Sequence, residues 1–422
     1  MLTESVPDPS APGAEGDLAR VLERAGTLAD LDGQAVVREY FETLSDDDAR
    51  LLALLFPAAI GNLAGAPFKA RADANAVRIA VNLQEWEEAM GDPVRELYED
   101  ILANDRQIVL FDPEGDGAMV EMFGSPGPET QNAGIYVPGT GSNLENFVNV
   151  AEKAKRLRGD NSVTFAWLGG DFPDGAEAGS AAHAMALAPG LASFTHQVRQ
   201  ELIHAGSPST AEISLEGHSY GGAVVGYTEN FSPDAQTVLH IESAGMGHDI
   251  FTPDDLPASQ EDVVRYSMTA PDDWIAPIQG AQEHSSAIEA GGAAVAASNP
   301  ATIGLVFPWN DVASTLGHGA DPDEFEGMTR LHTGNFSDNQ PPVPGRPEIQ
   351  PGAPIIGTPA HSNVFQVGSD AENNMAAIVN GQKDALEYYR EPIWGSDGGR
   401  LVLRGYDPTE TVVGWGPEQE PE

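Results

Sequence analysis

Ile213-Ser-Leu-Glu-Gly-His-Ser-Tyr-Gly-Gly222 contains a Gly-x-Ser-x-Gly sequence at the end of a short apolar strand pattern. Residues Ala211–Leu215 alternate as a strand does, and Tyr220–Phe231 can begin a helix at once. A chain that reverses this sharply holds the central serine, Ser219, in a strained turn with its hydroxyl exposed. Glycines flank the turn because a Cβ at either position would crowd the strand–helix crossing. The stretch predicts a nucleophilic serine; the alternative is a glycine-rich turn without chemistry.

Strand and helix patterns alternate on both sides of this stretch. Strands are expected at Gln107–Phe111, Ala118–Phe123, Ile135–Pro138, Ser162–Leu168, Thr237–Glu242, Val263–Met268 and Met328–Thr333. The first two flank an Asp-Pro-Glu-Gly-Asp-Gly turn, which predicts a hairpin. Helices are expected at Leu144–Leu157, in a long stretch ending near His204, and at Ala371–Tyr389. Such alternation predicts an α/β fold with a mostly parallel central sheet covered by helices on both faces.

Composition divides the chain into four regions: a disordered tail at 1–16, a helical N-terminal region at 17–104, an α/β domain at 105–390 and a C-terminal tail at 391–422. The first tail is rich in Pro, Ala, Gly and acidic residues. Within the α/β domain, residues 274–315 are rich in Ala and Gly and predict a lid-like insertion. Residues 339–354 are rich in Pro and predict an irregular loop.

Helical patterns dominate the N-terminal region. They cover Ala49–Phe56, Ala70–Met90 and Pro93–Ala103. Ser45 precedes three aspartates and predicts an N-terminal cap for the first of these helices, which Pro57 is expected to end.

The charge of the chain excludes several classes of partner. The net charge is −44 over 422 residues, so phosphate backbones and anionic membrane surfaces would repel the protein, and no nucleic-acid partner is expected. Hydrophobic residues make up 41% of the chain, enough to bury a large core. Cysteine is absent, which removes disulfides, thiolate metal sites and cysteine nucleophiles.

The beginning of the sequence, Met-Leu-Thr-Glu-Ser-Val-Pro-Asp-Pro, has neither a basic segment nor an apolar one of the kind found in signal peptides. No later segment approaches the roughly 18 uninterrupted apolar residues of a transmembrane helix. We therefore expect a cytoplasmic protein without stable membrane insertion; export by a route that needs no classical signal is the alternative.

A serine nucleophile needs a base, and the base needs an acid to orient it. In a strand–turn–helix site of this kind the acid follows the serine at the end of a later strand. Thr269-Ala-Pro-Asp-Asp-Trp-Ile275 is the expected place. We favour Asp273, because the bulky apolar pair after it can bury its carboxylate. Asp272 is the near alternative, and Glu242, at the end of the preceding strand, is the third.

The base is expected after the last strong strand and before a helix. His361, in Gly357-Thr-Pro-Ala-His-Ser-Asn-Val-Phe365, occupies that place. A surface histidine is the alternative. His218 lies inside the serine turn, where its ring is expected to pack or hydrogen-bond beneath the nucleophile rather than to act on it.

The oxyanion of the reaction needs backbone N–H donors. One is expected from Tyr220, directly after the nucleophile. The second is expected from Tyr136-Val-Pro-Gly-Thr-Gly-Ser-Asn143, at Thr140 or Gly141. This loop has neither the lysine nor the glycine spacing of a phosphate-binding loop. The sequence also lacks His and carboxylate residues at metal-ligand spacing, so neither metal nor cofactor is expected.

Together these motifs resemble the α/β-hydrolase superfamily and, more narrowly, an actinobacterial α/β-hydrolase family of unknown function. The resemblance covers roughly Phe56 to Gly381. It is carried by Val137-Pro-Gly-Thr-Gly141, Ala166-Trp-Leu-Gly169, Gly217-His-Ser-Tyr-Gly-Gly222, Asp273-Trp-Ile275, Pro57-Ala-Ala-Ile-Gly-Asn62, Gly65-Ala-Pro67 and Arg71-Ala-Asp-Ala-Asn75. It implies a triad of Ser219, Asp273 and His361. The chain departs from that family at Glu242-Ser-Ala-Gly245, where Gly-Ser-Pro-Gly is usual, and in its long Pro-rich loop.

This reading predicts a serine hydrolase that cleaves a carboxylic ester, with a lipid or another apolar acyl group as substrate. The predicted insertion would line the acyl pocket through Ile275, Ile278, Leu305, Val306, Phe307 and Trp309. Two alternatives stay open. One is a catalytically silent binding or scaffold protein that contacts a protein partner through its helical N-terminal region. The other is an acyltransferase that uses the same triad.

Overall fold

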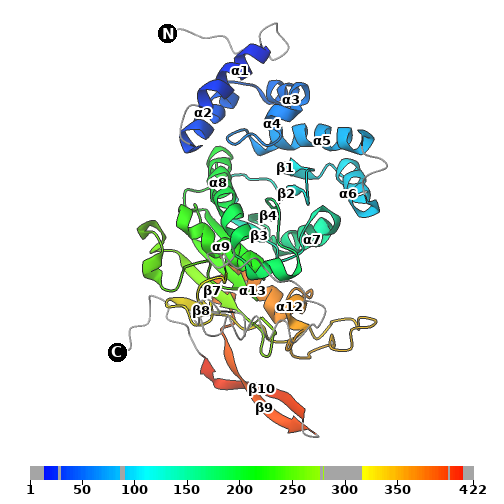
Figure 1. Cartoon of the computed structure of the whole chain (residues 1–422), viewed down its shortest axis with the longest axis vertical. Helices are drawn as coiled ribbons and strands as arrows, with labels where there is room; N and C mark the ends of the chain where they lie inside the picture. Colours follow the sequence, from blue (N-terminus) through cyan, green and yellow to red (C-terminus); the bar gives the residue numbers. More distant parts are fainter. Residues whose placement is uncertain are drawn as a thin grey trace.

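An eight-stranded sheet forms the centre of the protein, which Figure 1 shows as a computed structural model describing residues 14–26, 30–85, 91–275, 279, 316–397 and 400–411. Its strands are β1 (Gln107–Asp112), β2 (Ala118–Phe123), β3 (Asn132–Val137), β4 (Ser162–Leu168), β5 (Glu212–His218), β6 (Thr237–Ile241), β7 (Val264–Met268) and β8 (Met328–Arg330). Their order across the sheet is β1-β2-β4-β3-β5-β6-β7-β8. Neighbours from β4 to β8 run parallel, whereas β2 pairs antiparallel with both β1 and β4. The expected hairpin and the mostly parallel sheet are confirmed.

Helices cover both faces of this sheet. Two consecutive residues of β5, Glu216 and Gly217, point to opposite faces and lie near different helices. A Cβ on Gly134 of β3 would meet both Val379 of α13 (Asp370–Val379) and the carboxyl group of Glu216, so these groups share one face. The next residue, Gly217, faces Val225 of α9 (Tyr220–Thr228). Helix α8 (Ala182–His204) packs against α9, and α7 (Phe147–Leu157) packs against β4 and α13. Because both faces are covered, β4 and β6 are buried along their whole length and read as nearly continuous apolar runs.

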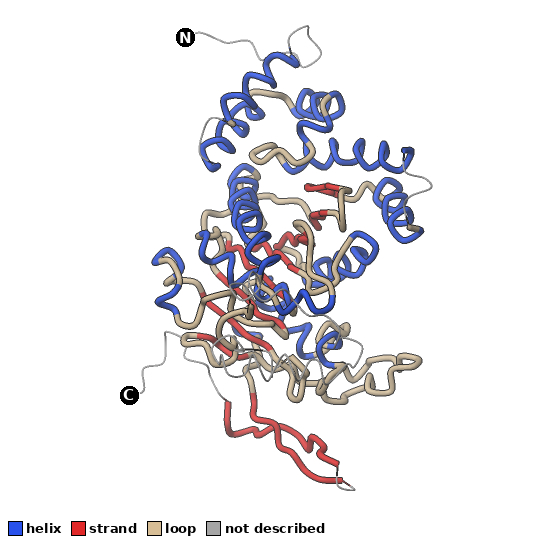
Figure 2. Tube along the Cα trace, viewed as in Figure 1, coloured by secondary structure: helices blue, strands red, loops and turns tan. Residues whose placement is uncertain are grey.

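Among the described residues, six helices precede the sheet: α1 (Ala14–Ala25), α2 (Asp30–Glu42), α3 (Asp46–Leu55), α4 (Pro57–Ile60), α5 (Phe68–Glu85) and α6 (Asp92–Ala103). The Ser45 hydroxyl accepts a hydrogen bond from the N–H of Asp48, which confirms the predicted cap of α3. Helices α1 to α5 share a small core of their own, formed by Leu18, Val37, Phe41, Leu52, Ile60, Ala66, Ala70 and Ala74 with their neighbours, whereas the buried residues of α6 belong to the core of the sheet. Figure 2 shows the helical region at one end of the molecule.

Aromatic rings join this region to the core of the sheet. Phe68, the first residue of α5, stacks on Phe194 of α8 with ring centroids 5.7 Å apart. Phe165 of β4 meets both rings edge-on, at 5.7 and 5.3 Å. All three side chains are almost fully buried. Such pairs contribute about 0.5–1.5 kcal/mol beyond the burial of their area.

The segment around α4 and α5 also covers β1, the edge strand of the sheet. The Asn62 side chain donates to the carbonyl oxygen of Phe111 (2.8 Å) and accepts from the N–H of the same residue (2.9 Å), as a neighbouring strand would. Asn75 donates to the carbonyl oxygens of Ile108 (3.0 Å) and Gly61 (2.7 Å). The Asn62 and Asn75 side chains therefore supply hydrogen bonds to backbone groups of Phe111 and Ile108 at the covered edge of the sheet.

Buried polar pairs attach the helical region to α8. Arg71 donates from Nη1 to Oε1 of Gln197 (2.5 Å), and Arg38 of α2 pairs with Glu201 (2.9 Å). Burial lowers the pKa of Arg71 to about 9, and the Glu201 carboxylate partly opposes that shift. The side chain thus stays charged at neutral pH. These contacts make the N-terminal region an outer layer of the α/β domain.

The C-terminal part differs from its expected pattern. The helix predicted to reach Tyr389 ends at Val379, because the backbone turns into the left-handed region at Gly381 (φ +64°). In the predicted C-terminal tail, β9 (Arg390–Asp397) and β10 (Arg400–Thr411) form an antiparallel hairpin, which projects from the molecule at the end opposite the helical region (Figure 1).

Other expectations fall wholly or partly outside the described residues. Most of the predicted insertion at 274–315 does so, with Ile278, Leu305, Val306, Phe307 and Trp309. Residues 1–13 of the predicted disordered tail at 1–16 also lie outside the described residues. The remaining three residues of that tail, 14–16, belong to α1. The Pro-rich loop at 339–354 is irregular, as expected.

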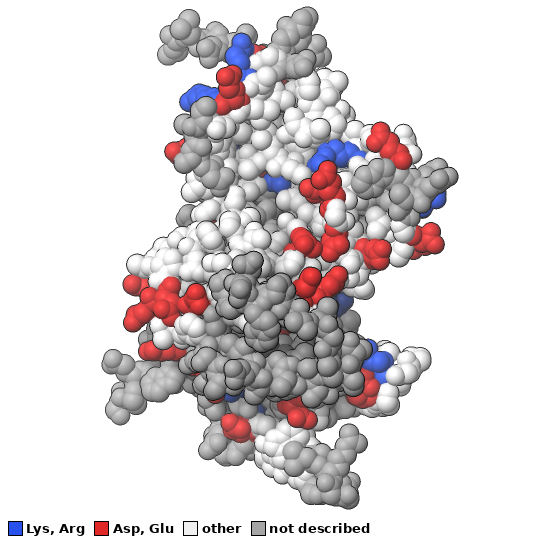
Figure 3. All heavy atoms as spheres, in the orientation of Figure 1, with Lys and Arg blue, Asp and Glu red and all other residues white. Residues whose placement is uncertain are grey.

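The surface carries the acidic excess of the sequence. On the face shown in Figure 3, acidic side chains gather in several groups, and lysine and arginine are sparse. Among the described helices, none combines the length and the apolar character that crossing a membrane requires.

Candidate active site

The Ser219 turn joins the end of β5 to the start of α9. Its backbone lies at φ +57° and ψ −121°, a region that a residue with a side chain rarely adopts. The flanking glycines allow the crossing. A Cβ on Gly217 would lie 2.4 Å from the carbonyl oxygen of Gly221, and a Cβ on Gly221 would lie 2.4 Å from the carbonyl oxygens of Val137 and Pro138. The strain is therefore built into the packing of strand, helix and neighbouring loop.

The structure brings His361 to this serine. His361 lies in the short helix α12 (Ala360–Asn363), and its Nε2 is 2.9 Å from Oγ of Ser219. This geometry suits a base that removes the hydroxyl proton. Ser219 is 7% exposed, and the His361 side chain is 12% exposed. The hydroxyl is thus shielded from bulk water without being sealed.

A second histidine, His218, forms a hydrogen bond with the backbone of His361. His218 donates from Nε2 to the carbonyl oxygen of His361 (2.8 Å), and the two rings lie 5.1 Å apart. Burial lowers the pKa of His218 well below its usual range, and the nearby Lys153 acts in the same direction. A neutral His218 that donates to the backbone of His361 fits the role expected from the sequence.

Of the candidate acids, Asp273 is the one beside the imidazole of His361. Its Oδ2 lies 3.5 Å from Nδ1 of His361, within ion-pair range but longer than a hydrogen bond. Catalytic hydrogen bonds are often long in the absence of substrate. Its other oxygen accepts from the N–H of Ile275 (2.9 Å), and its side chain is fully buried. Asp272, by contrast, is exposed at a left-handed position (φ +61°).

Glu242 lies behind Asp273, closer to the site than its third place in the sequence analysis suggested. It follows β6 at a left-handed position (φ +44°) and is fully buried. Its Oε1 accepts from the N–H of Ala270 (2.9 Å). Burial, together with the charge of Asp273, raises the pKa of Glu242 well above its usual range.

Glu242, Asp273 and His361 each place one potential metal-ligand atom within 4.8 Å of the others. The sequence analysis found no such cluster, because the three residues are far apart along the chain. Such a trio can in principle ligate a cation. Since the same imidazole contacts Ser219, the trio lies within the candidate active site.

The expected oxyanion loop passes directly beside the serine. A Cβ on Gly139 would lie 2.7 Å from Cβ of Ser219, so only glycine fits there. The N–H of Gly141 donates to the carbonyl oxygen of Pro173 (2.9 Å) and is therefore already engaged. This favours Thr140 over Gly141 as the donor from the loop. Tyr220 begins α9, so its N–H has no acceptor within the helix.

Trp274 contributes a feature that sequence reasoning missed. The apolar pair after Asp273 was expected to bury the Asp273 carboxylate, which is buried; of the pair itself, Ile275 is buried and Trp274 is 45% exposed. Its ring centroid lies 4.8 Å from that of the His361 ring, with an interplanar angle of 49°. An exposed indole beside the candidate base His361 offers an apolar surface that a small molecule can contact.

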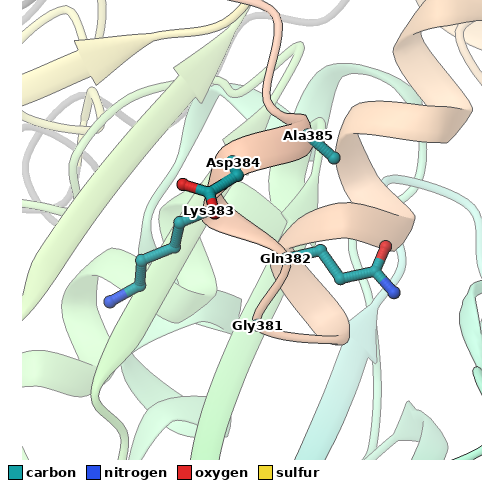
Figure 4. Close-up of a pocket in the computed structure, with 5 residues that line it drawn as sticks. All are labelled: Gly381, Gln382, Lys383, Asp384 and Ala385. Atoms are coloured by element: carbon teal, nitrogen blue, oxygen red, sulfur yellow. The ribbon is translucent and has the colours of Figure 1, made fainter.

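A separate hollow of about 470 Å³ is lined by Gly381, Gln382, Lys383, Asp384 and Ala385 (Figure 4). All five residues are exposed, and none is a candidate site residue. Gly381 lies beside Asn132, the first residue of β3. This hollow is therefore at the amino edge of the parallel strands, opposite the edge that carries Ser219.

Comparison with known proteins supports the fold. Residues 112–282 match the α/β-hydrolase family, a segment that contains Thr140, Ser219, Glu242 and Asp273 and ends before His361. The sheet, the strand–turn–helix at Ser219 and this match together define an α/β-hydrolase fold. A search of curated proteins found no match.

Several solved structures are similar in part. DcsB in complex with its substrate analogue shares 15% identity at a TM-score of 0.24, over 35% of this chain and 46% of that one. A lipase-esterase related protein from Clostridium acetobutylicum shares 16% identity at 0.19, over 29% and 46%. XC6422 from Xanthomonas campestris, described as an α/β serine hydrolase without lid, shares 15% identity at 0.27, over 54% and 84%. This chain thus spans less than half of the first two structures.

Proposed function

We propose that this protein is a serine hydrolase that cleaves a carboxylic ester through an acyl-enzyme. One observation carries the proposal: at a strained turn after β5, the Ser219 hydroxyl lies 2.9 Å from Nε2 of His361. The pairing of a serine with a base within hydrogen-bond reach is the arrangement that nucleophilic catalysis requires. The narrower resemblance to the actinobacterial family is part of the same proposal.

Each residue then has a defined role. His361 removes the proton of Ser219 as the serine oxygen attacks the acyl carbonyl carbon. The Asp273 carboxylate, 3.5 Å from Nδ1, stabilises the imidazolium that forms. The amides of Tyr220 and Thr140 donate to the oxyanion. His361 then protonates the leaving alcohol and activates water, which releases the acid and regenerates the serine.

Two observations support an ester with an apolar acyl or alcohol group. Trp274 presents its ring at the imidazole, and Ile275 is buried beside it. The net charge of −44 would disfavour a strongly anionic substrate. A lipid-like ester fits both properties.

Hydrolysis of p-nitrophenyl esters of increasing acyl length tests the proposal. Wild type should release p-nitrophenol, with a burst if the acyl-enzyme accumulates, and Ser219→Ala should lose at least about 10³-fold in kcat. Ser362→Ala, an exposed serine next to His361, is the matched control and should keep wild-type activity. Folded wild type that cleaves none of the esters would contradict the proposal. It would favour the silent binding protein.

Added alcohol separates the remaining alternative. A hydrolase passes the acyl group mainly to water, whereas an acyltransferase passes it to the alcohol and forms a new ester. Mass spectrometry of the products distinguishes the free acid of a hydrolase from the new ester of an acyltransferase. Both activities use the same proposed triad.

A further inference from the structure

Three buried polar atoms meet behind Ser219 without hydrogen-bond partners among the described residues. They are Oε2 of Glu242, Oδ2 of Asp273 and Nδ1 of His361. An unmet hydrogen bond of a buried polar group costs about 1–3 kcal/mol, so a cluster of three requires an explanation. Protons between these atoms explain the cluster. The Nδ1–H of the His361 imidazole can donate to Asp273, and one further proton can lie between the carboxyl groups of Asp273 and Glu242.

The surroundings decide which carboxyl group holds that further proton. The groups that face Glu242 are Asp273, His361 and Asp323, and the last of these is paired with Arg330 at 2.9 Å. Glu242 thus meets two other carboxylates. Two carboxylates held this close in a buried site do not both ionise readily at neutral pH.

Asp273 is the better place for the negative charge. It accepts from the N–H of Ile275 and faces the imidazole, which becomes cationic during catalysis. Glu242 is fully buried, and the hydrogen bond that its Oε1 accepts comes from the neutral N–H of Ala270. Burial and the charge of Asp273 raise the pKa of Glu242, which agrees with this assignment.

We propose that Glu242 is a positioning residue: a neutral carboxylic acid that donates a hydrogen bond to the Asp273 carboxylate and holds it toward His361. The site is then a chain of four groups, Ser219, His361, Asp273 and Glu242. The proposal rests on the proposed function for its kinetic consequence, but the state of the Glu242 carboxyl group can be measured without any activity.

The backbone at Glu242 supports a function for this side chain. A non-glycine residue at φ +44° costs of the order of 1–3 kcal/mol and persists only where the surroundings enforce it. Glycine would relieve that cost. A glutamate at this position therefore requires a compensating role, which the hydrogen bond to Asp273 provides.

Infrared difference spectroscopy tests the protonation state directly. The difference spectrum of wild type minus Glu242→Gln at neutral pH should show the carbonyl stretch of a buried, protonated carboxylic acid, while the bands of other buried carboxyl groups with raised pKa values, such as Glu216, cancel. Asp273→Asn should keep the band, because burial alone holds the proton on Glu242. A band that is unchanged in Glu242→Gln, or that disappears in Asp273→Asn instead, would overturn the assignment, whether or not the protein hydrolyses esters.

Stability gives a second readout that needs no substrate. A carboxyl group whose pKa is raised by folding stabilises the native state at low pH and loses that contribution as pH rises through its folded value. Glutamine cannot ionise, so Glu242→Gln should gain stability relative to wild type as pH increases. Urea unfolding from pH 5 to 9 measures the difference. A difference that is constant with pH would contradict a neutral Glu242.

Kinetics then separate positioning from a direct role as the acid. Glutamine can still donate to Asp273, so Glu242→Gln should keep kcat within about 3-fold of wild type at pH 7. Glu242→Gly removes the donor and should lower kcat by about 10–100-fold, the usual range for a group that orients another. If Glu242→Gln lost as much as Asp273→Asn, Glu242 itself would be the ionised acid, and the proposal would be wrong.

Discussion

Two edges of the same sheet bury polar side chains in opposite ways. At the β1 edge, Asn62 and Asn75 make three hydrogen bonds to backbone groups of Phe111 and Ile108 in the strand, and Asn75 makes a fourth to Gly61. At the carboxyl edge, Glu242 and its neighbours leave buried polar atoms without partners among the described residues, and the backbone adopts left-handed conformations. Backbone strain together with unmet hydrogen bonds coincides with the candidate active site, whereas the paired groups at the β1 edge stabilise the fold.

The largest effect expected from this comparison is on activity at the carboxyl edge. Asp273→Asn should lower kcat by about 10³–10⁴-fold, because an amide cannot stabilise the imidazolium and can favour the wrong tautomer of His361. Stability should change little, since asparagine keeps the shape of the side chain. Ester hydrolysis and urea unfolding on the same preparation measure both quantities.

Asp272→Asn is the matched control. Asp272 is exposed at φ +61°, a conformation that asparagine tolerates, so both activity and stability should remain those of wild type. Equal losses in the two variants would remove the distinction between the adjacent aspartates.

A smaller effect, on stability instead of activity, is expected at the β1 edge. Asn75→Ala removes the donor to the carbonyl oxygens of Gly61 and Ile108, and Gly61 keeps only the long contact from Nε of Arg71 (3.5 Å). The loss should cost about 2–4 kcal/mol of unfolding free energy. The kcat of the folded fraction should stay near wild type. Urea unfolding and ester hydrolysis measured below the transition check the two expectations.

Asn82→Ala, on the same helix but only partly buried, provides the comparison for this variant. It removes one hydrogen bond, to the carbonyl of Arg78, and should cost less than about 1 kcal/mol. A large loss of kcat in folded Asn75→Ala would mean that the two edges are not independent.

The parts of the site that depend on neighbouring residues were predictable from the sequence. Gly217, Ser219 and Gly221 lie within one turn, so their steric relation follows from local geometry. The order of strands and helices predicted that Asp273 and His361 follow later strands than Ser219 does. In the structure, His361 contacts Ser219 and Asp273 lies beside His361. The choice between Thr140 and Gly141 was open, because it depends on a contact with Pro173.

Tertiary contacts determine what the sequence did not reveal. Asn62 and Asn75 were visible as motifs, but their partners lie on a strand more than thirty residues further along the chain. The place of Glu242 behind Asp273 depends on the packing of β6 against β7. The prediction that the last helix continues past Val379 was wrong. Apolar residues recur at helical spacing beyond that point, but the chain leaves the helix at Asn380-Gly381.

Labelling with a fluorophosphonate probe tests the central claim most directly, because the probe reacts only with an activated serine. The modified residue is mapped by mass spectrometry in wild type and in His361→Ala, both shown to be folded. We predict modification at Ser219 in wild type and its loss in the variant. A folded wild-type protein that is not labelled at Ser219, or a His361→Ala variant labelled as fast as wild type, would contradict the assignment of Ser219 and His361 as nucleophile and base.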